Sequence, residues 1–90
     1  MAAETPEFVL TVRLAEPFRE GVGEVFMVST PVANLGELVP VLRAALPGFA
    51  ENYDEGYVFA VNGRIILSGE RTTALASGDE VELMLALAGG

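Results

Sequence analysis

The side chains that most often perform chemistry in proteins are almost missing from this sequence. It contains no histidine and no cysteine, and its five basic side chains are all arginine, so that lysine amines are missing too. Without imidazole or thiol, the chain has no base or nucleophile for Ser-His-Asp or Cys-His catalysis and no imidazole or thiolate metal ligand. We therefore expect the chain not to be an enzyme and to hold no metal site.

The sequence ends in two glycines, Gly89 and Gly90, preceded by Ala88. Glycine has no Cβ and accepts most backbone angles, so this tail could enter a narrow channel and leave the terminal carboxylate open to attack. An inert, frayed terminus or the end of a fragment would look the same, because ten of the 90 residues are glycine. The two glycines therefore indicate a reactive tail only in combination with the elements that precede them.

Two groups of acidic residues offer a second chemical interpretation. Asp54 and Glu55 lie near Glu51, and Asp79 precedes Glu80. Carboxylates in such groups can bind calcium or act as general acids and bases, but the twelve-residue spacing of a calcium loop is missing. Solvated loop residues and turn chemistry explain both groups better.

The charge of the chain limits its partners. Thirteen acidic and five basic side chains give a net charge of −8, which repels nucleic acid and anionic lipid surfaces. The N-terminal residues lack the pattern of a signal peptide, and no apolar run approaches the roughly 20 residues that span a bilayer. We expect one soluble, cytoplasmic domain over residues 1–90, with no nucleic-acid or membrane partner.

The first half of the chain predicts two strands and one helix. Apolar residues alternate from Phe8 to Leu14, and Val25 to Val28 form a second run, so the two segments are expected to pair as a hairpin. Asn34 and Glu37 resemble a capping box at the start of a helix. Five apolar residues then repeat at helical spacing: Leu35, Leu38, Val39, Leu42 and Leu46.

Pro40 interrupts this helical pattern. A proline inside a helix lacks an amide hydrogen and crowds the carbonyl four residues earlier, at a cost of about 3 kcal/mol. We therefore predict that the first regular turn begins late, near Glu37, where the proline costs little. Pro47 and Gly48 should end the helix, and residues 49–56 are expected to be irregular.

The second half predicts three strands joined by tight turns. A buried strand over Tyr57–Val61 should turn at Asn62-Gly63 into a short strand over Arg64–Leu67. After a turn at Ser77–Asp79, the last strand should cover Glu80–Leu87. This order predicts an α+β fold in which a mixed sheet of four to five strands curls over one main helix.

Aromatic and apolar side chains on these strands could serve the core or a binding surface. Tyr57, Phe59 and Phe26 occur at strand spacing, which favours the core over an exposed aromatic patch. In the last strand, Val81, Leu83, Leu85 and Leu87 alternate with Glu82, Met84 and Ala86. If the helix covers the leucines, Met84 and Ala86 belong to an open sheet surface on which a partner could dock.

Three local signals resemble the ubiquitin-like β-grasp sulfur carriers of the MoaD/ThiS type, and most closely the small subunit of molybdopterin synthase. The first is Val61-Asn62-Gly63, and the second is Leu75 followed by Ser77–Val81. The third is the terminal Ala88-Gly89-Gly90. The resemblance is strongest over residues 59–90, and the helix exit at Leu46–Gly48 and the order of elements support it upstream.

The resemblance implies a carrier function for Gly90. An E1-like partner would use ATP to adenylate its carboxylate, and a sulfurtransferase or cysteine desulfurase would supply the sulfur that converts it to a thiocarboxylate. Gly89 and Ala88 would give access, and Met84, Ala86 and Leu87 would dock the partner. No cofactor would be bound by the chain, and residues 87–90 would form a flexible tail.

The resemblance also implies which pathway receives the sulfur, although the residues before the two glycines depart from the family pattern. Members of the molybdopterin type carry a Pro-Pro-Val-Ala/Ser segment before the two glycines, whereas this chain has Leu85-Ala86-Leu87-Ala88. Molybdopterin synthesis, with the large synthase subunit as a candidate partner, is the expected pathway, and a related cofactor, thiamine or cysteine pathway is the other possible recipient of the sulfur. A modifier joined through Gly90 to lysines of other proteins, and an interaction module with an inert tail, are the alternatives.

Overall fold

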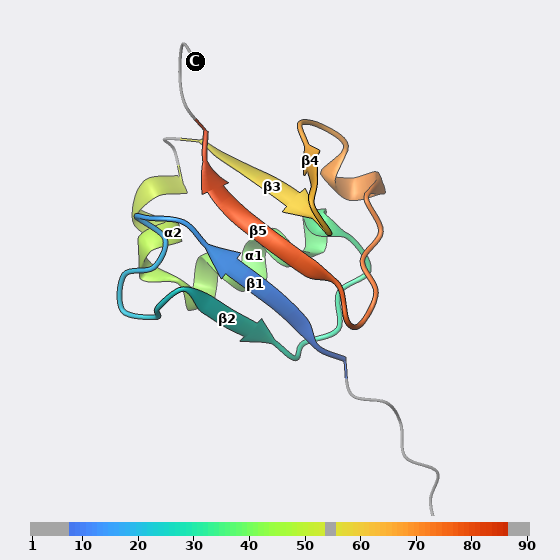
Figure 1. The fold of residues 1–90 in the computed structure, drawn as a ribbon, viewed down its shortest axis with the longest axis horizontal. Coiled ribbons are helices and arrows are strands. Elements are labelled where there is room, and N and C mark those ends of the chain that lie inside the picture. Colours follow the sequence, from blue (N-terminus) through green and yellow to red (C-terminus); the bar gives the residue numbers. More distant parts are fainter. Residues whose placement is uncertain (1–7, 54–55, 87–90) are drawn as a thin grey trace, which may run out of the picture.

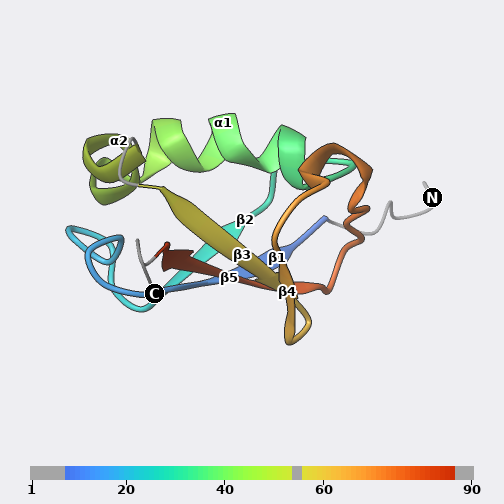
Figure 2. The ribbon, with the colours of Figure 1, turned by 90° about the horizontal axis from the view of Figure 1, so that it is seen from above.

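A five-stranded mixed sheet that packs one face against helices forms the body of the protein (Figure 1). The computed structural model describes residues 8–53 and 56–86. The strand order is β2-β1-β5-β3-β4, so that the last strand of the sequence lies in the middle of the sheet. Figure 2 shows both helices above the same face of the sheet. The predicted α+β, β-grasp architecture is thus confirmed.

The N-terminal hairpin forms as the alternation predicts. Strand β1 covers Leu10–Leu14 and pairs antiparallel with β2, which covers Val25–Val28. Leu10, Val12 and Leu14 turn into the core, and none of them is more than 3% exposed. The residues between them face the opposite side of the sheet, because side chains alternate along a strand.

The C-terminal strands surround a central β5. Strand β3 (Tyr57–Val61) turns at Asn62-Gly63 into β4 (Arg64–Ile66), and β5 covers Glu80–Leu85. β5 runs parallel to β1 on one side and antiparallel to β3 on the other. A short 3₁₀ turn, η2 (Glu70–Thr72), lies in the segment that leads from β4 to β5. The predicted tail at residues 87–90 lies outside the described residues.

Helix α1 covers Leu35–Ala45, so the predicted late start near Glu37 is wrong. Asn34 caps the helix by accepting a hydrogen bond from the amide of Glu37 at 2.9 Å. The carboxylate of Glu37 accepts in return from the amide of Ala33 at 2.8 Å, one residue earlier than in the usual capping box. These bonds satisfy amides that a helix start leaves unpaired, and they fix the first turn ahead of the proline.

Pro40 therefore lies inside α1, where sequence reasoning did not place it. It is exposed on the outer face of the helix, while Leu35, Leu38, Val39 and Leu42 on the inner face are buried. Water can reach the outer face and solvate the carbonyl of Gly36, which has lost its helical donor. The proline thus costs less there than it would in the core.

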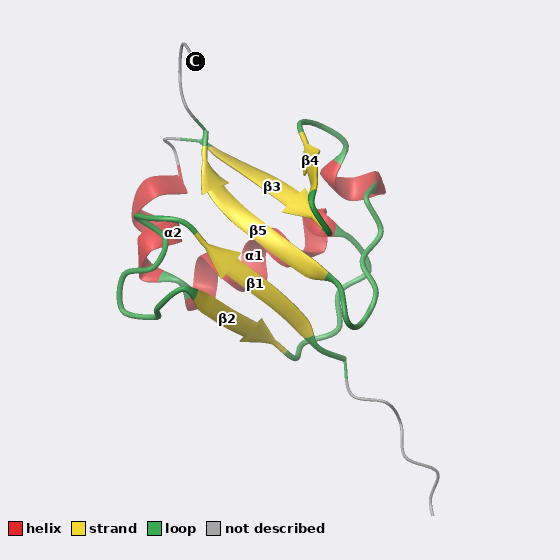
Figure 3. Ribbon diagram, in the orientation of Figure 1, coloured by secondary structure: helices red, strands yellow, loops and turns green. Residues whose placement is uncertain are grey.

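The segment expected to be irregular contains a second helix, α2, over Pro47–Asn52 (Figure 3). Leu46 ends α1 and also begins α2, with extended backbone angles at the joint. Pro47 occupies the first turn of α2, where its missing amide hydrogen has no helical partner to lose. Phe49 is fully buried and anchors this helix to the core. The Pro-Gly pair therefore ends one helix and starts another.

The junction between the helices leaves no space at Gly48. A Cβ built at this position would come within 2.5 Å of the carbonyl oxygen of Pro17 and 3.1 Å of the Cα of Phe18. Both are backbone atoms, so neither can move without shifting the loop after β1. At Gly36 a Cβ would instead meet two side-chain atoms, Cγ of Arg71 at 2.9 Å and Oδ1 of Asn34 at 3.1 Å, and would reach backbone only at the Cα of Arg71, 3.4 Å away.

We predict that Gly48→Ala lowers the free energy of unfolding by about 1 to 3 kcal/mol, because the added methyl group forces the Pro17 loop and α2 apart. Gly36→Ala is the matched control and should cost clearly less, because Arg71 can move and alanine favours the helix. Urea unfolding followed by circular dichroism measures both. Equal losses in the two variants would contradict the close contact at Gly48.

Candidate functional site

The candidate site is the end of β5, where the sequence leads to the two glycines. Of the predicted site residues, the structure describes Met84 in β5 and Ala86 just after it. Leu87, Ala88, Gly89 and Gly90 lie outside the described residues. The structure therefore shows what holds the start of the tail, and the role of the tail itself stays a prediction.

β5 is anchored on its inner face and leaves its outer face uncovered. Val81 and Leu83 are fully buried beneath α1, whereas Glu82, Met84 and Ala86 are only half-buried. No other element of the described chain covers the side of the sheet opposite α1 and α2 in Figure 2. Met84 and Ala86 thus lie outside the core, as the alternation along the strand predicts.

The neighbours of β5 change along its length. Its parallel ladder with β1 ends where Leu14 pairs with Leu83, and the amide of Ala15 then donates to the carbonyl of Leu83 at 3.0 Å. Pairing with β3 continues further, to Tyr57 opposite Leu85. Beyond it, the amide of Ala86 donates to the carbonyl of Gly56 at 3.2 Å. The start of the tail is therefore held from the β3 side.

Aromatic rings support β3 at this end of the sheet. The centroid of Phe49 lies 5.7 Å from Phe18, 5.5 Å from Tyr53 and 5.0 Å from Tyr57, with the rings edge to face. The ring of Tyr57 contacts that of Phe59, with 5.4 Å between centroids. Such pairs each add roughly 0.5 to 1.5 kcal/mol to area burial. The cluster ties α2 to the strand that holds the start of the tail.

The predicted placement of the aromatic residues in the core is confirmed. Phe59 is 1% exposed, and Phe26 and Tyr57 are partly buried against the core. Arg43 covers Tyr53 from outside, with its guanidinium carbon 4.0 Å from the ring centroid. The sequence does not predict the packing of Phe49 and Tyr53 beside Tyr57, because the polar residues around them indicate an irregular loop. The one local signal for this helix is the large apolar Phe49 two residues after Pro47, a residue that the structure buries.

The environment of Tyr57 disfavours its ionised form. Burial raises the pKa of its hydroxyl, and a hydrogen bond with Tyr53 and the negative charge of Glu70 raise it further. Tyr57 therefore stays protonated in the folded protein when a free tyrosine would begin to ionise. The hydroxyl serves the packing of this end and is not poised for proton transfer near neutral pH.

The opposite end of β5 is held by Asn62, in the turn between β3 and β4. Its φ of +50° lies in the left-handed region, which asparagine tolerates better than most residues. The side-chain oxygen accepts from the amide of Glu80 at 2.9 Å, and the side-chain nitrogen donates to Asp79 at 3.1 Å. The carboxylate of Asp79 also accepts from the amide of Ala76 at 2.9 Å. Asp79 is thus used to order the turn, as turn chemistry predicts.

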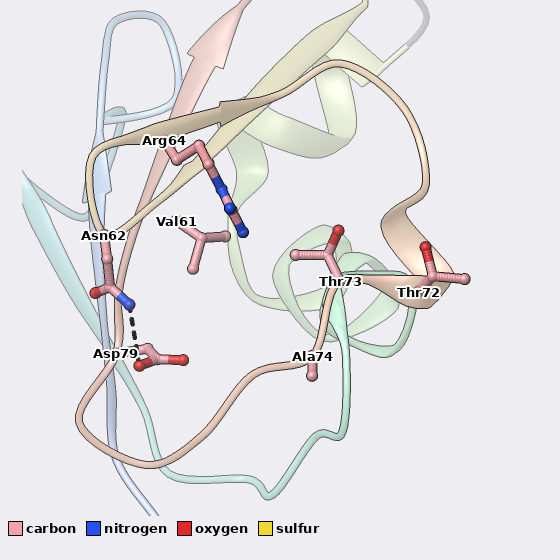
Figure 4. A pocket seen from close by; sticks show the side chains of 7 residues that line it. All are labelled: Val61, Asn62, Arg64, Thr72, Thr73, Ala74 and Asp79. Carbon is pink, nitrogen blue, oxygen red and sulfur yellow. Dashed lines mark hydrogen bonds between the residues drawn. The ribbon is translucent and has the colours of Figure 1, made fainter.

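A pocket of about 540 Å³ opens beside this turn (Figure 4). Its lining residues come from the β3–β4 turn and from the segment before β5: Val61, Asn62, Arg64, Thr72, Thr73, Ala74 and Asp79. Both threonine hydroxyls donate to the carbonyl of Gly69. The pocket lies at the start of β5, and a six-residue strand spans about 20 Å. It is therefore remote from the tail.

The acidic side chains of the described residues do not gather into a metal-binding group. Within residues 8–53 and 56–86, no group of three acidic side chains is arranged to hold a metal ion. Glu51 lies on α2, while Asp54 and Glu55 are outside the described ranges. The same part of the chain contains no helix that is long and apolar enough to cross a membrane.

Comparisons with known proteins agree with this arrangement. The ThiS family model matches residues 12–90. The HVO 2177 protein of Haloferax volcanii superposes with a TM-score of 0.76 and 26% identity, covering 100% of this chain and 93% of that chain. Comparison with curated proteins gives no match.

Two further solved structures share the fold. A chain from the complex of subunits 1 and 2 of the Helicobacter pylori molybdopterin-converting factor has a TM-score of 0.64 and 25% identity, covering 92% of this chain and 100% of that one. The small archaeal modifier protein 1 of Methanosarcina acetivorans has a TM-score of 0.69 and 20% identity, with 96% and 100% coverage.

We predict that Asn62→Gly costs about 1 kcal/mol of stability through the lost bonds to Glu80 and Asp79, since glycine keeps the positive φ. Asn62→Ala should cost about 1 kcal/mol more, because alanine is also strained in the left-handed region. Urea unfolding of both variants separates the two contributions. If the variants were equally stable, the backbone strain would not matter at this turn.

We predict that stability falls as the pH rises above 10.0, the ordinary pKa of a tyrosine. In that range the unfolded chain loses a proton that folded Tyr57 retains, so the unfolded state is favoured. Tyr57→Phe lacks this proton, and its unfolding midpoint should decline less. Urea midpoints between pH 8 and pH 11 measure the difference. Parallel declines in both proteins would show that Tyr57 does not contribute.

Proposed function

Because the chain belongs to the ThiS family, we propose that it is a sulfur carrier that bears sulfur as a thiocarboxylate on Gly90. Proteins of this type are small ubiquitin-like carriers, and partner enzymes perform their catalysis. The recipient that we propose is a molybdopterin precursor. The carboxylate of Gly90 is the group to which the sulfur is attached, and Gly89 and Ala88 give partner enzymes access to it. The chain itself binds no cofactor.

The observation that carries this proposal is the continuity between the family match and β5. The match extends through β5 and includes both glycines. β5 is paired on both sides up to Leu83, and the bond from Ala86 to Gly56 then holds the start of the tail. A body followed by a segment whose last two residues have no side chains suits an acyl group that must reach another protein's active site.

The proposed chemistry begins with activation by a partner. A carboxylate is a poor acyl donor, so an E1-like adenylating enzyme joins it to AMP from ATP and releases pyrophosphate. Sulfide attacks the acyl carbon of Gly90, AMP leaves, and a thiocarboxylate remains. Where the sulfur comes from a persulfide on a sulfurtransferase or cysteine desulfurase, an acyl disulfide forms first and a thiol reductant cleaves it. The chain contributes no side chain to these steps.

Docking is the part of the function that the body of the chain performs. Met84 and Ala86 lie on the open face of the sheet beside the start of the tail, and we propose that they contact the partner together with Leu87. Methionine adapts its shape to different surfaces, which suits a carrier that meets an activating enzyme, a sulfur donor and a sulfur acceptor in turn.

The choice of molybdopterin rests on the likeness to the molybdopterin-converting factor. That Helicobacter pylori protein forms a complex of subunits 1 and 2, and it shares 25% identity with this chain. We propose that a large synthase subunit is the corresponding acceptor here. The residues before the glycines, Leu85 to Ala88, differ from the family's proline pair, so the acceptor's channel should accommodate a different tail.

We predict that the protein purified from its native host gains the mass difference of sulfur for oxygen, located by fragmentation at Gly90. Deletion of Gly90 should abolish both this gain and the ATP–pyrophosphate exchange that the adenylating partner catalyses with the carrier. Glu20→Gln, at an exposed position in the β1–β2 loop, is a control that leaves the terminus intact and should keep both activities.

Other outcomes would favour the alternatives. If Gly-Gly remnants appear on lysines of other proteins while no thiocarboxylate is found, the chain is a ubiquitin-like modifier. If deletion of Gly90 leaves its cellular function unaltered, the tail is inert and the chain is an interaction module. Either result would contradict the sulfur-carrier proposal.

A further inference from the structure

One row of side chains crosses the whole open face of the sheet. The registers place Val25 of β2 beside Arg13 of β1, Arg13 beside Glu82 of β5, Glu82 beside Ala60 of β3, and Ala60 beside Ile65 of β4. The row therefore begins and ends with apolar side chains and has charged ones near its middle. Figure 1 shows the five strands from this open side, with α1 behind them.

The apolar side chains at both ends of the row are exposed. Val25 is 41% exposed and Ile65 is 59% exposed. Met27, in the next row of β2, is 53% exposed. On the β5 side, half-buried Met84 lies beside Val58 of β3 and leads to the start of the tail. Val25 and Met27 lie at one edge of the face and Ile65 at the other, so a partner could make apolar contacts on both sides of the charged centre.

The charges in the middle of the row do not cancel. Nε of Arg13 donates to the carboxylate of Glu80 at 2.6 Å, diagonally across the strands, and not to Glu82 directly opposite. Within the described part of the chain, the Glu82 carboxylate forms no hydrogen bond or ion pair, although its charge acts on Arg13 at longer range. Glu82 is thus a surplus negative charge at the centre of the face.

Glu82 is also the central charge that a docked partner would cover. It is half-buried, and Ala60 beside it is only 2% exposed although it points to the open face. The registers place Glu82 and Ile65 on either side of this small side chain. A protein surface laid over the row would exclude water from the Glu82 carboxylate. Covering an ion that has no counter-charge of its own is unfavourable, and Arg13 is already bonded to Glu80, so the partner should supply a cation.

We propose that this open face docks a partner surface that presents an arginine or lysine to Glu82, flanked by apolar side chains that meet Val25, Met27 and Ile65. The occupant is the E1-like adenylating enzyme, so this inference rests on the proposed function. Continuity supports this choice, because the same strand carries Glu82, then Met84, and then the tail that the enzyme must receive. The net charge of −8 further favours a basic partner surface.

The test is ATP–pyrophosphate exchange by the source organism's adenylating enzyme, measured at increasing carrier concentration. Glu82→Gln keeps the shape of the side chain and removes its charge. It should raise KM for the carrier on the order of tenfold and leave kcat unchanged, because the lost contact lies outside the reacting tail. Glu82→Arg should raise KM further, since it places like charges together.

Glu51→Gln is the matched control, because it removes the same charge from an exposed position on α2, on the helical side of the sheet. Its KM should equal that of the unaltered carrier. Added salt should raise KM of the unaltered carrier more steeply than that of Glu82→Gln. Thermal unfolding of each variant confirms that the fold is intact.

The outcomes separate this inference from the proposed function. If the unaltered carrier supports exchange and Glu82→Gln has the same KM as Glu51→Gln, the charged docking contact is overturned and the carrier function stands. If the unaltered carrier supports no exchange with the enzyme, the proposed function has failed and the docking inference fails with it.

Discussion

The pairing of β5 between β1 and β3 is the constraint on which the rest of this structure depends. It joins the N-terminal hairpin to the C-terminal hairpin, and its inner residues Val81 and Leu83 fill the core beneath α1. Both of its ends are fixed, by Asn62 at Glu80 and by Gly56 at Ala86. Because the strand cannot slip without turning its leucines outward, the position at which the chain leaves the body is defined.

Local patterns were sufficient to predict the strands, and they failed where two effects competed. The alternation in β1 and the Asn62-Gly63 turn are short-range signals with one physical meaning each. In α1, the Asn34 cap favours an early helix start and the penalty of Pro40 favours a late one. The cap determines the start, because an exposed proline costs less than a buried one. At α2, the Pro-Gly pair indicates the end of a helix but also begins a new one. Phe49 anchors α2 through partners such as Phe18 that are far away in the sequence, so no local pattern predicts this role.

The candidate site likewise combines features that local patterns predict with features that depend on distant parts of the sequence. That Met84 and Ala86 face away from the core follows from alternation alone, so sequence could predict it. That Glu82 stands beside Arg13 and yet lacks its hydrogen bond depends on the parallel register of two strands at opposite ends of the chain. No local pattern fixes such a register. The carrier role of Gly90 is a different kind of prediction, since it concerns chemistry that belongs to partner enzymes.

The central parallel pairing of β1 with β5 also has a consequence for synthesis on the ribosome. β1 must wait for residues 80–85 before the middle of the sheet can close, because its neighbour β5 follows the other four strands of the described chain. Until then, β1 and β3 each expose an edge that could pair with other chains. A chain truncated before β5 would not form the body that positions a reactive end. Closure of the middle of the sheet and placement of the segment that follows β5 therefore occur in one folding event.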